Sequence, residues 1–85
     1  MGSLRFGAVI FQVYTHDHLP RHVHARHAGI IVIIEIWRGG ARLGRRADRI
    51  TPRNAKRSDV AFVLKVARLR QAELNQLWED THDRA

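Results

Sequence analysis

The chain has 85 residues, a formal net charge of +7 at pH 7, six histidines and no cysteine. A chain of this length forms one small domain that buries about 60–65 % of its unfolded surface, so a partner surface would add to its stability. Disulfides and thiolate metal sites are excluded, and the longest apolar run, GIIVII, is far shorter than the roughly 20 residues of a membrane-spanning helix. We therefore expect a single cytoplasmic domain over residues 1–85, with no secretory signal, no membrane contact, and residues 1–5 either disordered or a remnant of cloning.

The first half of the sequence predicts three strands. They cover residues 8–15, 22–27 and 30–37. Pro20 predicts an extended turn between the first two, because the residue before a proline avoids the helical region. In the second strand, HVHARH, strict alternation places His22, His24 and Arg26 on one side. The third strand, IIVIIEIW, is apolar almost throughout, which predicts that both of its faces are buried.

The second half of the sequence predicts helix. Thr51 and Pro52 form one candidate helix start, and Ser58-Asp59 forms another. An apolar stripe at helical spacing follows, made of Val60, Val63, Leu64, Ala67, Leu74, Leu77 and Trp78. Gln71 interrupts this stripe, so one long helix and two short helices both remain open.

These elements predict an α+β fold, a small antiparallel sheet of three to four strands followed by C-terminal helix. One helical layer can cover only one face of a sheet. Because the strand over residues 30–37 is apolar on both faces, we expect a second copy of the chain or a partner protein to cover the other. A homodimer is the simplest such assembly.

A basic connecting segment, residues 38–57, carries the whole of the net charge. It contains eight basic residues and one acidic residue, so the rest of the chain is neutral. Seven of the basic residues are candidate nucleic-acid contacts, namely Arg42, Arg45, Arg46, Arg49, Arg53, Lys56 and Arg57. A concentrated positive charge of this kind favours a polyanionic partner, nucleic acid above all. The alternative is a solvated, mobile loop that keeps the protein soluble.

The run HDHLPRHVH, residues 16–24, holds four of the six histidines, and three interpretations stay open. His18, His22 and His24 could bind zinc or another divalent metal, with Asp17 as a further ligand or an orienting group. The same three histidines could act as acid and base in a ribonuclease, with Arg26 stabilising the developing negative charge. Alternatively, the imidazoles and Asp17 could simply bind the backbone of the turn.

Other polar and aromatic residues are weaker candidates. Glu35 stands among isoleucines, so we expect an arginine or the histidine face to neutralise it. Trp37 and Trp78 are expected in the core rather than stacked on bases. His27 and His82 are expected at the surface.

Two motifs together resemble a small bacterial family catalogued as a domain of unknown function, number 4160. The first is Asp-His-x-Pro-x-His-x-His, matched by Asp17, His18, Pro20, His22 and His24. The second is a late helix with an EL…W ending, matched by Glu73, Leu74 and Trp78. The resemblance covers roughly residues 6 to 80, although Leu19 and Arg21 replace prolines of the usual pattern and the basic link is longer.

The resemblance implies one half of a two-gene module that looks like a toxin–antitoxin pair, with a small protein as partner. It implies no substrate, cofactor or catalytic residue. Together with the basic segment, it predicts a small binding protein that contacts nucleic acid and a protein partner. The alternative is an enzyme, either a histidine-dependent ribonuclease or a metal-dependent hydrolase, centred on the histidine run.

Overall fold

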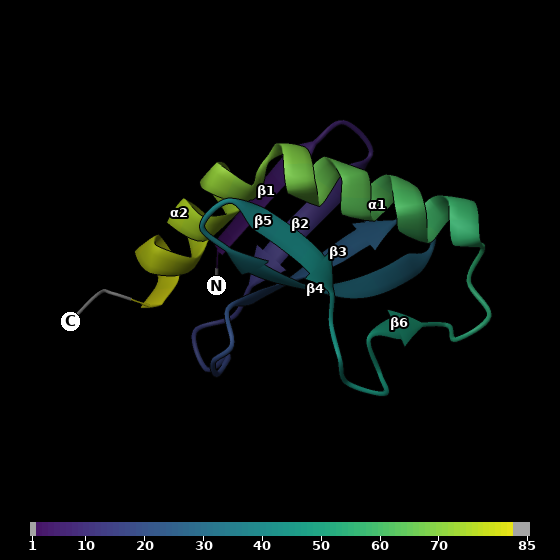
Figure 1. The fold of residues 1–85 in the computed structure, drawn as a ribbon, viewed down its shortest axis with the longest axis horizontal. Helices are drawn as coiled ribbons and strands as arrows, with labels where there is room; N and C mark the ends of the chain where they lie inside the picture. The colour runs from purple at the N-terminus through teal and green to yellow at the C-terminus, as the bar shows by residue number, and fades with distance from the viewer. Residues whose placement is uncertain (1, 83–85) are drawn as a thin grey trace.

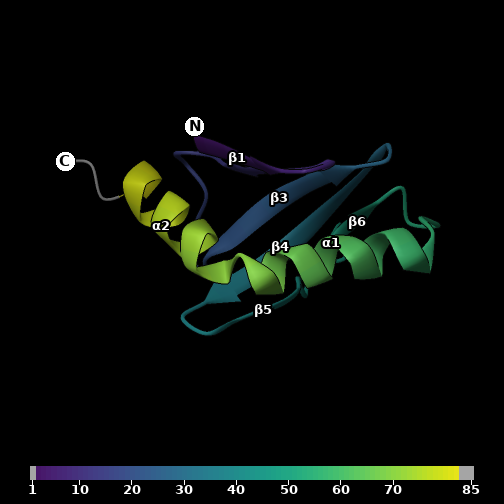
Figure 2. The same ribbon diagram turned by 90° about the horizontal axis from the view of Figure 1, so that it is seen from above.

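A computed structural model describes residues 2–82 and shows a curved antiparallel sheet with two helices on one face (Figures 1 and 2). The strands are β1 (Gly2–Phe6), β2 (Val9–Val13), β3 (His22–His27), β4 (Ile30–Trp37), β5 (Gly40–Leu43) and β6 (Ile50–Thr51). The helices are α1 (Arg57–Leu69) and α2 (Gln71–His82). Strands β1 to β5 are neighbours in chain order. Strand β4 pairs with β3 along one edge. Its other edge is shared by β5 and β6, which pair with different parts of β4.

The α+β class and the order of sheet and helix are confirmed, but the described residues form six strands rather than three or four. The extra strands lie in segments that were not expected to be regular. Residues 1–5 are predicted to be disordered or a remnant of cloning, but Gly2–Phe6 form the edge strand β1. There Leu4 pairs with Phe11 and Phe6 pairs with Val9, and the two rings of Phe6 and Phe11 lie 6.0 Å apart. The basic segment over residues 38–57 contains β5 and β6 and is therefore part of the sheet.

The central hairpin of β3 and β4 follows the predicted alternation. Val23 and Ala25 are fully buried, whereas His22 and His24 are half-buried on the other face. The two-residue turn between the strands has positive φ at both positions, 49° at Ala28 and 79° at Gly29. That conformation is typical of a tight hairpin, and glycine adopts it without steric cost.

The helices pack the predicted stripe against the sheet. Val63, Ala67, Leu74 and Trp78 are buried in the same core as β2, β3 and β4. The start at Thr51 is wrong, because β6 pairs with β4 through Ile31 and Val32 and the helix begins only at Arg57. The second candidate start, at Ser58, lies one residue from the observed one. The interruption near Gln71 is a real break, which falls at Arg70 between the two helices.

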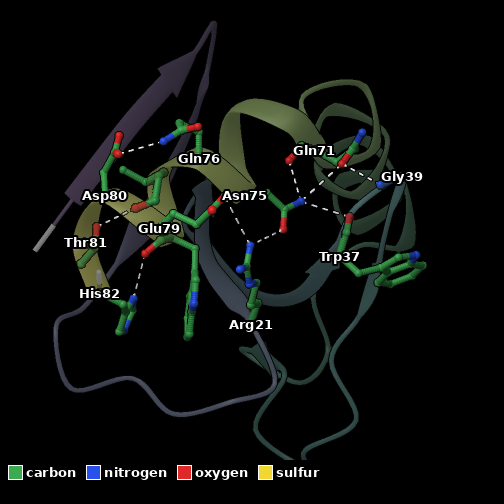
Figure 3. Close-up of polar contacts among 12 residues, drawn as sticks. Arg21, Trp37, Gly39, Gln71, Asn75, Gln76, Glu79, Asp80, Thr81 and His82 are labelled. Atoms are coloured by element: carbon green, nitrogen blue, oxygen red, sulfur yellow. Dashed lines mark hydrogen bonds and ion pairs between the residues drawn. The ribbon is translucent and has the colours of Figure 1, made fainter. Parts of the chain in front are cut away.

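A buried amide fixes α2 against the end of the sheet (Figure 3). Asn75 is only 8 % exposed, and its Nδ2 donates to the carbonyl of Trp37 at 3.0 Å and to that of Gln71 at 2.8 Å. Its Oδ1 accepts from Nη1 of Arg21 at 3.2 Å. Asn75 therefore joins α2 to the end of β4 and to the residue that leads into β3.

Both faces of β4 are buried, as predicted, but the second face is covered by the chain itself. Ile33 is 9 % exposed and Glu35 is 7 % exposed, although they lie away from the helices. The backbone of Gly44 lies against Ile33, and two arginine side chains lie over Glu35. The burial of β4 therefore requires no second copy, and the homodimer stays a prediction without this support.

Candidate histidine and arginine site

Two loops meet at one end of the sheet and enclose a pocket of about 500 Å³, which we call the site pocket. One loop is the histidine turn, residues 14–21, which links β2 to β3. The other is the arginine loop, residues 44–49, which links β5 to β6. Figure 1 shows both loops below the sheet. The pocket is lined by His16, Asp17, His18, Leu19, Pro20, His22, Ile33, Glu35, Gly44, Arg45 and Arg46.

The arginine loop is held at both ends by one residue of β4. The N–H of Gly44 donates to the carbonyl of Ile33, and the N–H of Ile33 donates to the carbonyl of Arg49, each at 2.8 Å. A β-carbon at position 44 would lie 3.0 Å from that carbonyl oxygen of Ile33, so glycine permits the close approach. These contacts place Arg45 and Arg46 on the wall of the site pocket.

Glu35 is the buried anion that organises the arginines. Its Oε1 accepts from Nη2 of Arg42 at 3.1 Å, and its Oε2 accepts from the backbone N–H and Nε of Arg45, both at 3.2 Å. Burial raises the pKa of this carboxyl, but the hydrogen bonds from Arg45 and Arg42 outweigh burial and hold the pKa below its ordinary value. The expectation that an arginine neutralises Glu35 is confirmed.

A compact acid–histidine cluster lies beside the pocket. Asp17 Oδ1 lies 3.5 Å from Nε2 of His22, and Asp17 Oδ2 lies 3.6 Å from Nε2 of His24. The backbone N–H of Tyr14 donates to Oδ2 of Asp17 at 2.9 Å, which fixes the carboxylate within the turn. The aspartate thus closes the turn and also faces both imidazoles.

The two imidazoles of this cluster differ in their hydrogen bonding, and only that of His22 is oriented by a backbone contact. Nδ1 of His22 lies 2.9 Å from the carbonyl oxygen of Pro20. Because a carbonyl only accepts, Nδ1 carries a proton, and in the neutral ring the lone pair lies on Nε2, towards Asp17. The pKa of His24 is below its ordinary value. Burial, which disfavours the charged ring, is the largest cause, and it outweighs the nearby charge of Asp17, which raises the pKa. Nε2 of His24 is buried and has no hydrogen-bond partner among the described residues.

The structure separates the candidate site residues into groups. His22 and His24 meet at Asp17, whereas His18 lines the site pocket as an exposed residue outside this cluster. Arg26 follows the two histidines on the same face of β3, but its Nε donates to Oε1 of Gln12 at 2.7 Å and it does not line the pocket. Asp17, treated in the sequence as a secondary group, is the residue that joins the two histidines.

The seven candidate nucleic-acid contacts differ in whether their side chains already have partners within the protein. Arg42 and Arg45 bind Glu35, and Arg46 pairs with the exposed Asp48 at 3.2 Å. Arg49 donates from Nη1 to the carbonyl of Arg46. The remaining three are exposed: Arg53 and Lys56 lie between β6 and α1, and Arg57 is the first residue of α1.

His27 and His82 pack against the fold, whereas the two tryptophans differ in burial. His27 Nδ1 lies 3.0 Å from the carbonyl oxygen of Ala8, and His82 stacks on Trp78 with ring centroids 3.9 Å apart. Both histidines are partly buried, so they lie at the surface as predicted but with only part of the side chain exposed. Trp78 lies in the core as predicted, whereas Trp37 is 45 % exposed, which corrects its placement there.

Comparisons with models of known protein families, with curated proteins and with solved structures find no significant match to this chain. The family resemblance carried by the Asp-His-x-Pro-x-His-x-His motif therefore stays a prediction that rests on that motif. Within residues 2–82, neither helix has the length and apolar character needed to cross a membrane.

Proposed function

We propose that this protein binds nucleic acid, with a phosphate group in the site pocket and the adjoining backbone along the basic segment. One observation supports the proposal above the others: Arg45 and Arg46 line the same pocket as the histidine turn, although about 25 residues separate the two in the sequence. Arginine binds phosphate through a planar fork of donors, and neutral or charged imidazole adds further donors.

The ion pairs of the segment divide its arginines into two roles. Arg42 and Arg45 together carry two positive charges against the single charge of Glu35, so this group keeps an excess of one. Of the two, Arg45 lines the pocket, and its bonds to Glu35 hold that part of the pocket wall. The exposed residues Arg53, Lys56 and Arg57 supply mobile charge for sequence-independent phosphate contacts.

The test compares two variants of equal charge by fluorescence anisotropy with a single-stranded RNA and a DNA duplex. The segment variant is Arg53→Ala with Lys56→Ala, and the control is Arg5→Ala with Lys65→Ala. All four residues are exposed, and Lys56 precedes α1 without a side-chain capping bond. The segment variant is expected to bind more weakly and to lower the slope of log K against log salt by about 1.4–1.8, the value for two lost phosphate contacts.

The control variant is expected to keep the slope of the unmodified protein within experimental error. Equal weakening in both variants would mean that only the overall charge matters, which contradicts a binding role for the segment. At a low salt concentration of about 50 mM, even weak non-specific complexes are expected to form. If the unmodified protein binds neither nucleic acid under these conditions, the proposal is rejected.

A second candidate function is cleavage of the bound phosphodiester. It is favoured by the position of His18 and His22 on the pocket wall, within the same cavity as Arg45 and Arg46. One imidazole would remove the proton of the attacking oxygen and another would protonate the leaving oxygen. RNA cleavage that is lost in His18→Ala and His22→Ala but kept in His27→Ala would support it, and intact RNA after prolonged incubation would reject it.

The family resemblance supports a small protein partner and a place in a bacterial two-gene module of toxin–antitoxin type. A cytoplasmic location is part of this proposal because nucleic acid is the proposed ligand. Co-purification of the chain with the product of the adjacent gene tests the module, and a neighbouring gene product that does not bind this protein would argue against it.

A further inference from the structure

We propose that Asp17, His22 and His24 form a binding site for one transition-metal ion of the zinc type, with an open coordination position towards the site pocket. The proposal concerns metal binding alone and does not depend on whether the pocket binds nucleic acid. It moves the metal site predicted from the sequence, because Asp17 replaces His18 as the third ligand.

The spacing of the donor atoms suits a tetrahedral ion. Ligand atoms 2.0–2.1 Å from a tetrahedral zinc lie about 3.3–3.4 Å from one another. The two Asp17–histidine distances, 3.5 Å from Oδ1 to His22 and 3.6 Å from Oδ2 to His24, are close to that separation and involve one carboxylate oxygen each. One donor atom from each of the three residues lies within 4.8 Å of the other two. Because this bound of 4.8 Å exceeds the separation at a tetrahedral zinc, the proposal requires the side chains to move closer together when the ion binds.

The donors are also presented in the form that a metal requires. The proton on Nδ1 of His22 is held by the carbonyl of Pro20, so Nε2 offers its lone pair to an ion. A backbone carbonyl on the second ring nitrogen is a common partner of metal-binding histidines, because it fixes the ring and its tautomer. The N–H of Tyr14 holds the carboxylate of Asp17 in the same way.

Without a cation, the cluster is poorly satisfied. In neutral His22 the lone pair of Nε2 and the carboxylate of Asp17 face each other at 3.5 Å as two acceptors. Nε2 of His24 is buried with no hydrogen-bond partner among the described residues. An unpaired buried polar atom costs free energy, and a shared metal ion would satisfy all three groups at once.

The position of the cluster gives the ion access to a ligand. Asp17 and His22 line the site pocket, whereas His24 lies outside its lining, with its ring centroid 4.9 Å from that of Tyr14. The side chains of Asp17, His22 and His24 are 14 %, 13 % and 23 % exposed, so the ion would be partly enclosed and open on the pocket side. Two imidazoles and one carboxylate favour zinc or its neighbours over magnesium, which prefers oxygen ligands and bound water.

The test is titration of the chelator-treated full chain with ZnCl₂, followed by calorimetry in a buffer that does not bind zinc. One ion per chain is expected, and MgCl₂ at the same concentrations is expected to give no heat of binding. We expect zinc binding to weaken by about 100-fold or more in each of three variants, Asp17→Asn, His22→Gln and His24→Gln. Loss of a residue that only hydrogen-bonds to a metal ligand costs less, about 10–100-fold. His18→Gln, the matched control on the same turn, is expected to stay within about twofold of the unmodified protein.

A spectroscopic measurement covers the possibility that a buried histidine variant fails to fold. Co²⁺ added to the unmodified protein is expected to give the intense visible bands of a tetrahedral complex, and zinc is expected to displace it. Circular dichroism of each variant in chelator shows whether the fold is kept. Either of two results would overturn the proposal: zinc affinity that falls as much in His18→Gln as in the folded Asp17→Asn, or no stoichiometric zinc and no tetrahedral cobalt spectrum in the unmodified protein.

Discussion

Replacement of Glu35 by glutamine tests how the arginine side of the pocket is built. Glutamine keeps the size of the side chain but removes its charge and one of its two acceptor atoms. Because each carboxylate oxygen binds a different arginine, Arg42 on Oε1 and Arg45 on Oε2, the substitution must leave one of them facing an NH₂ group.

The expected cost follows from the exposure of the partners. A hydrogen bond to a charged group contributes about 1.5–3 kcal/mol when it is buried. The side chains of Arg42 and Arg45 are 52 % and 68 % exposed, so water replaces much of what they lose, and exposed ion pairs contribute only about 0–1 kcal/mol each. With the backbone N–H of Arg45 included, we expect Glu35→Gln to lower the free energy of unfolding by about 1–2 kcal/mol. In a domain of this size that corresponds to a fall in Tm of about 4–16 °C.

The pH dependence provides a second and independent check. The pKa of Glu35 in the folded protein is below its ordinary value of 4.5, so the unfolded chain binds the proton more readily. The stabilisation by Glu35 is therefore complete above about pH 4.5 and is lost as the pH falls through the lowered pKa. The difference in stability between the unmodified protein and Glu35→Gln is expected to shrink over this range.

The assay is urea unfolding followed by circular dichroism at pH 7 and at several lower values, in the presence of a chelator. Glu73→Gln is the control, because Glu73 forms an exposed pair with Arg70 at 3.4 Å and its loss is expected to cost less than about 0.5 kcal/mol. Equal stability of Glu35→Gln and the unmodified protein at pH 7 would refute the reasoning. A stability difference that stays constant down to pH 2.5, on the order of two units below the ordinary pKa, would refute it as well.

Three further substitutions test the packing that positions the site. Leu74→Ala, at a fully buried position of α2, is expected to cost about 2–5 kcal/mol in urea unfolding, and a cost below 1 kcal/mol would contradict the described core. Asn75→Ala removes the donor to the carbonyl of Trp37 and is expected to lower the free energy of unfolding by about 1–3 kcal/mol. The amide chemical shift of Arg21 is also expected to change in NMR spectra, and an unchanged shift would argue against the contact between Arg21 and Asn75. Gly44→Ala places a β-carbon 3.0 Å from the carbonyl oxygen of Ile33, so faster hydrogen exchange is expected at the Gly44-position amide, and unaltered exchange would count against the close approach.

The parts of the fold that could be predicted are those with a long periodic pattern. The alternation of HVHARH and the apolar run of β4 gave strands with nearly the observed bounds, and the helical stripe gave the buried face of α1 and α2. Short edge strands could not be predicted in the same way. β1 has only five residues and β6 only two, and both owe their strand conformation to pairing with a neighbour rather than to their own sequence.

The candidate site was predictable in its strand residues but not in its loops. His22 and His24 share a face because a strand alternates with a period of two. The choice between Asp17 and His18 depends on how the histidine turn closes, and this is decided by one hydrogen bond from the N–H of Tyr14. An aspartate just after a strand is a known turn former, so the signal was present but did not show that the carboxylate also faces the imidazoles. The pairing of Glu35 with Arg45 was likewise not predictable in detail. It depends on the hydrogen bonds that hold both ends of the arginine loop to Ile33.

The double attachment at Ile33 makes the arginine loop an exchangeable unit. Both ends of the loop are fixed by the N–H and the carbonyl of a single residue in the middle of the sheet. Arg45 is tied to Glu35, but residues 46–48 can change in sequence or length without any shift in strand register, since the entropic cost of a longer loop rises only slowly with length. The arginine wall of the pocket can therefore be altered independently of the histidine turn. Grafting a different loop between Arg45 and Arg49 would change that wall while keeping the sheet and the contact of Arg45 with Glu35.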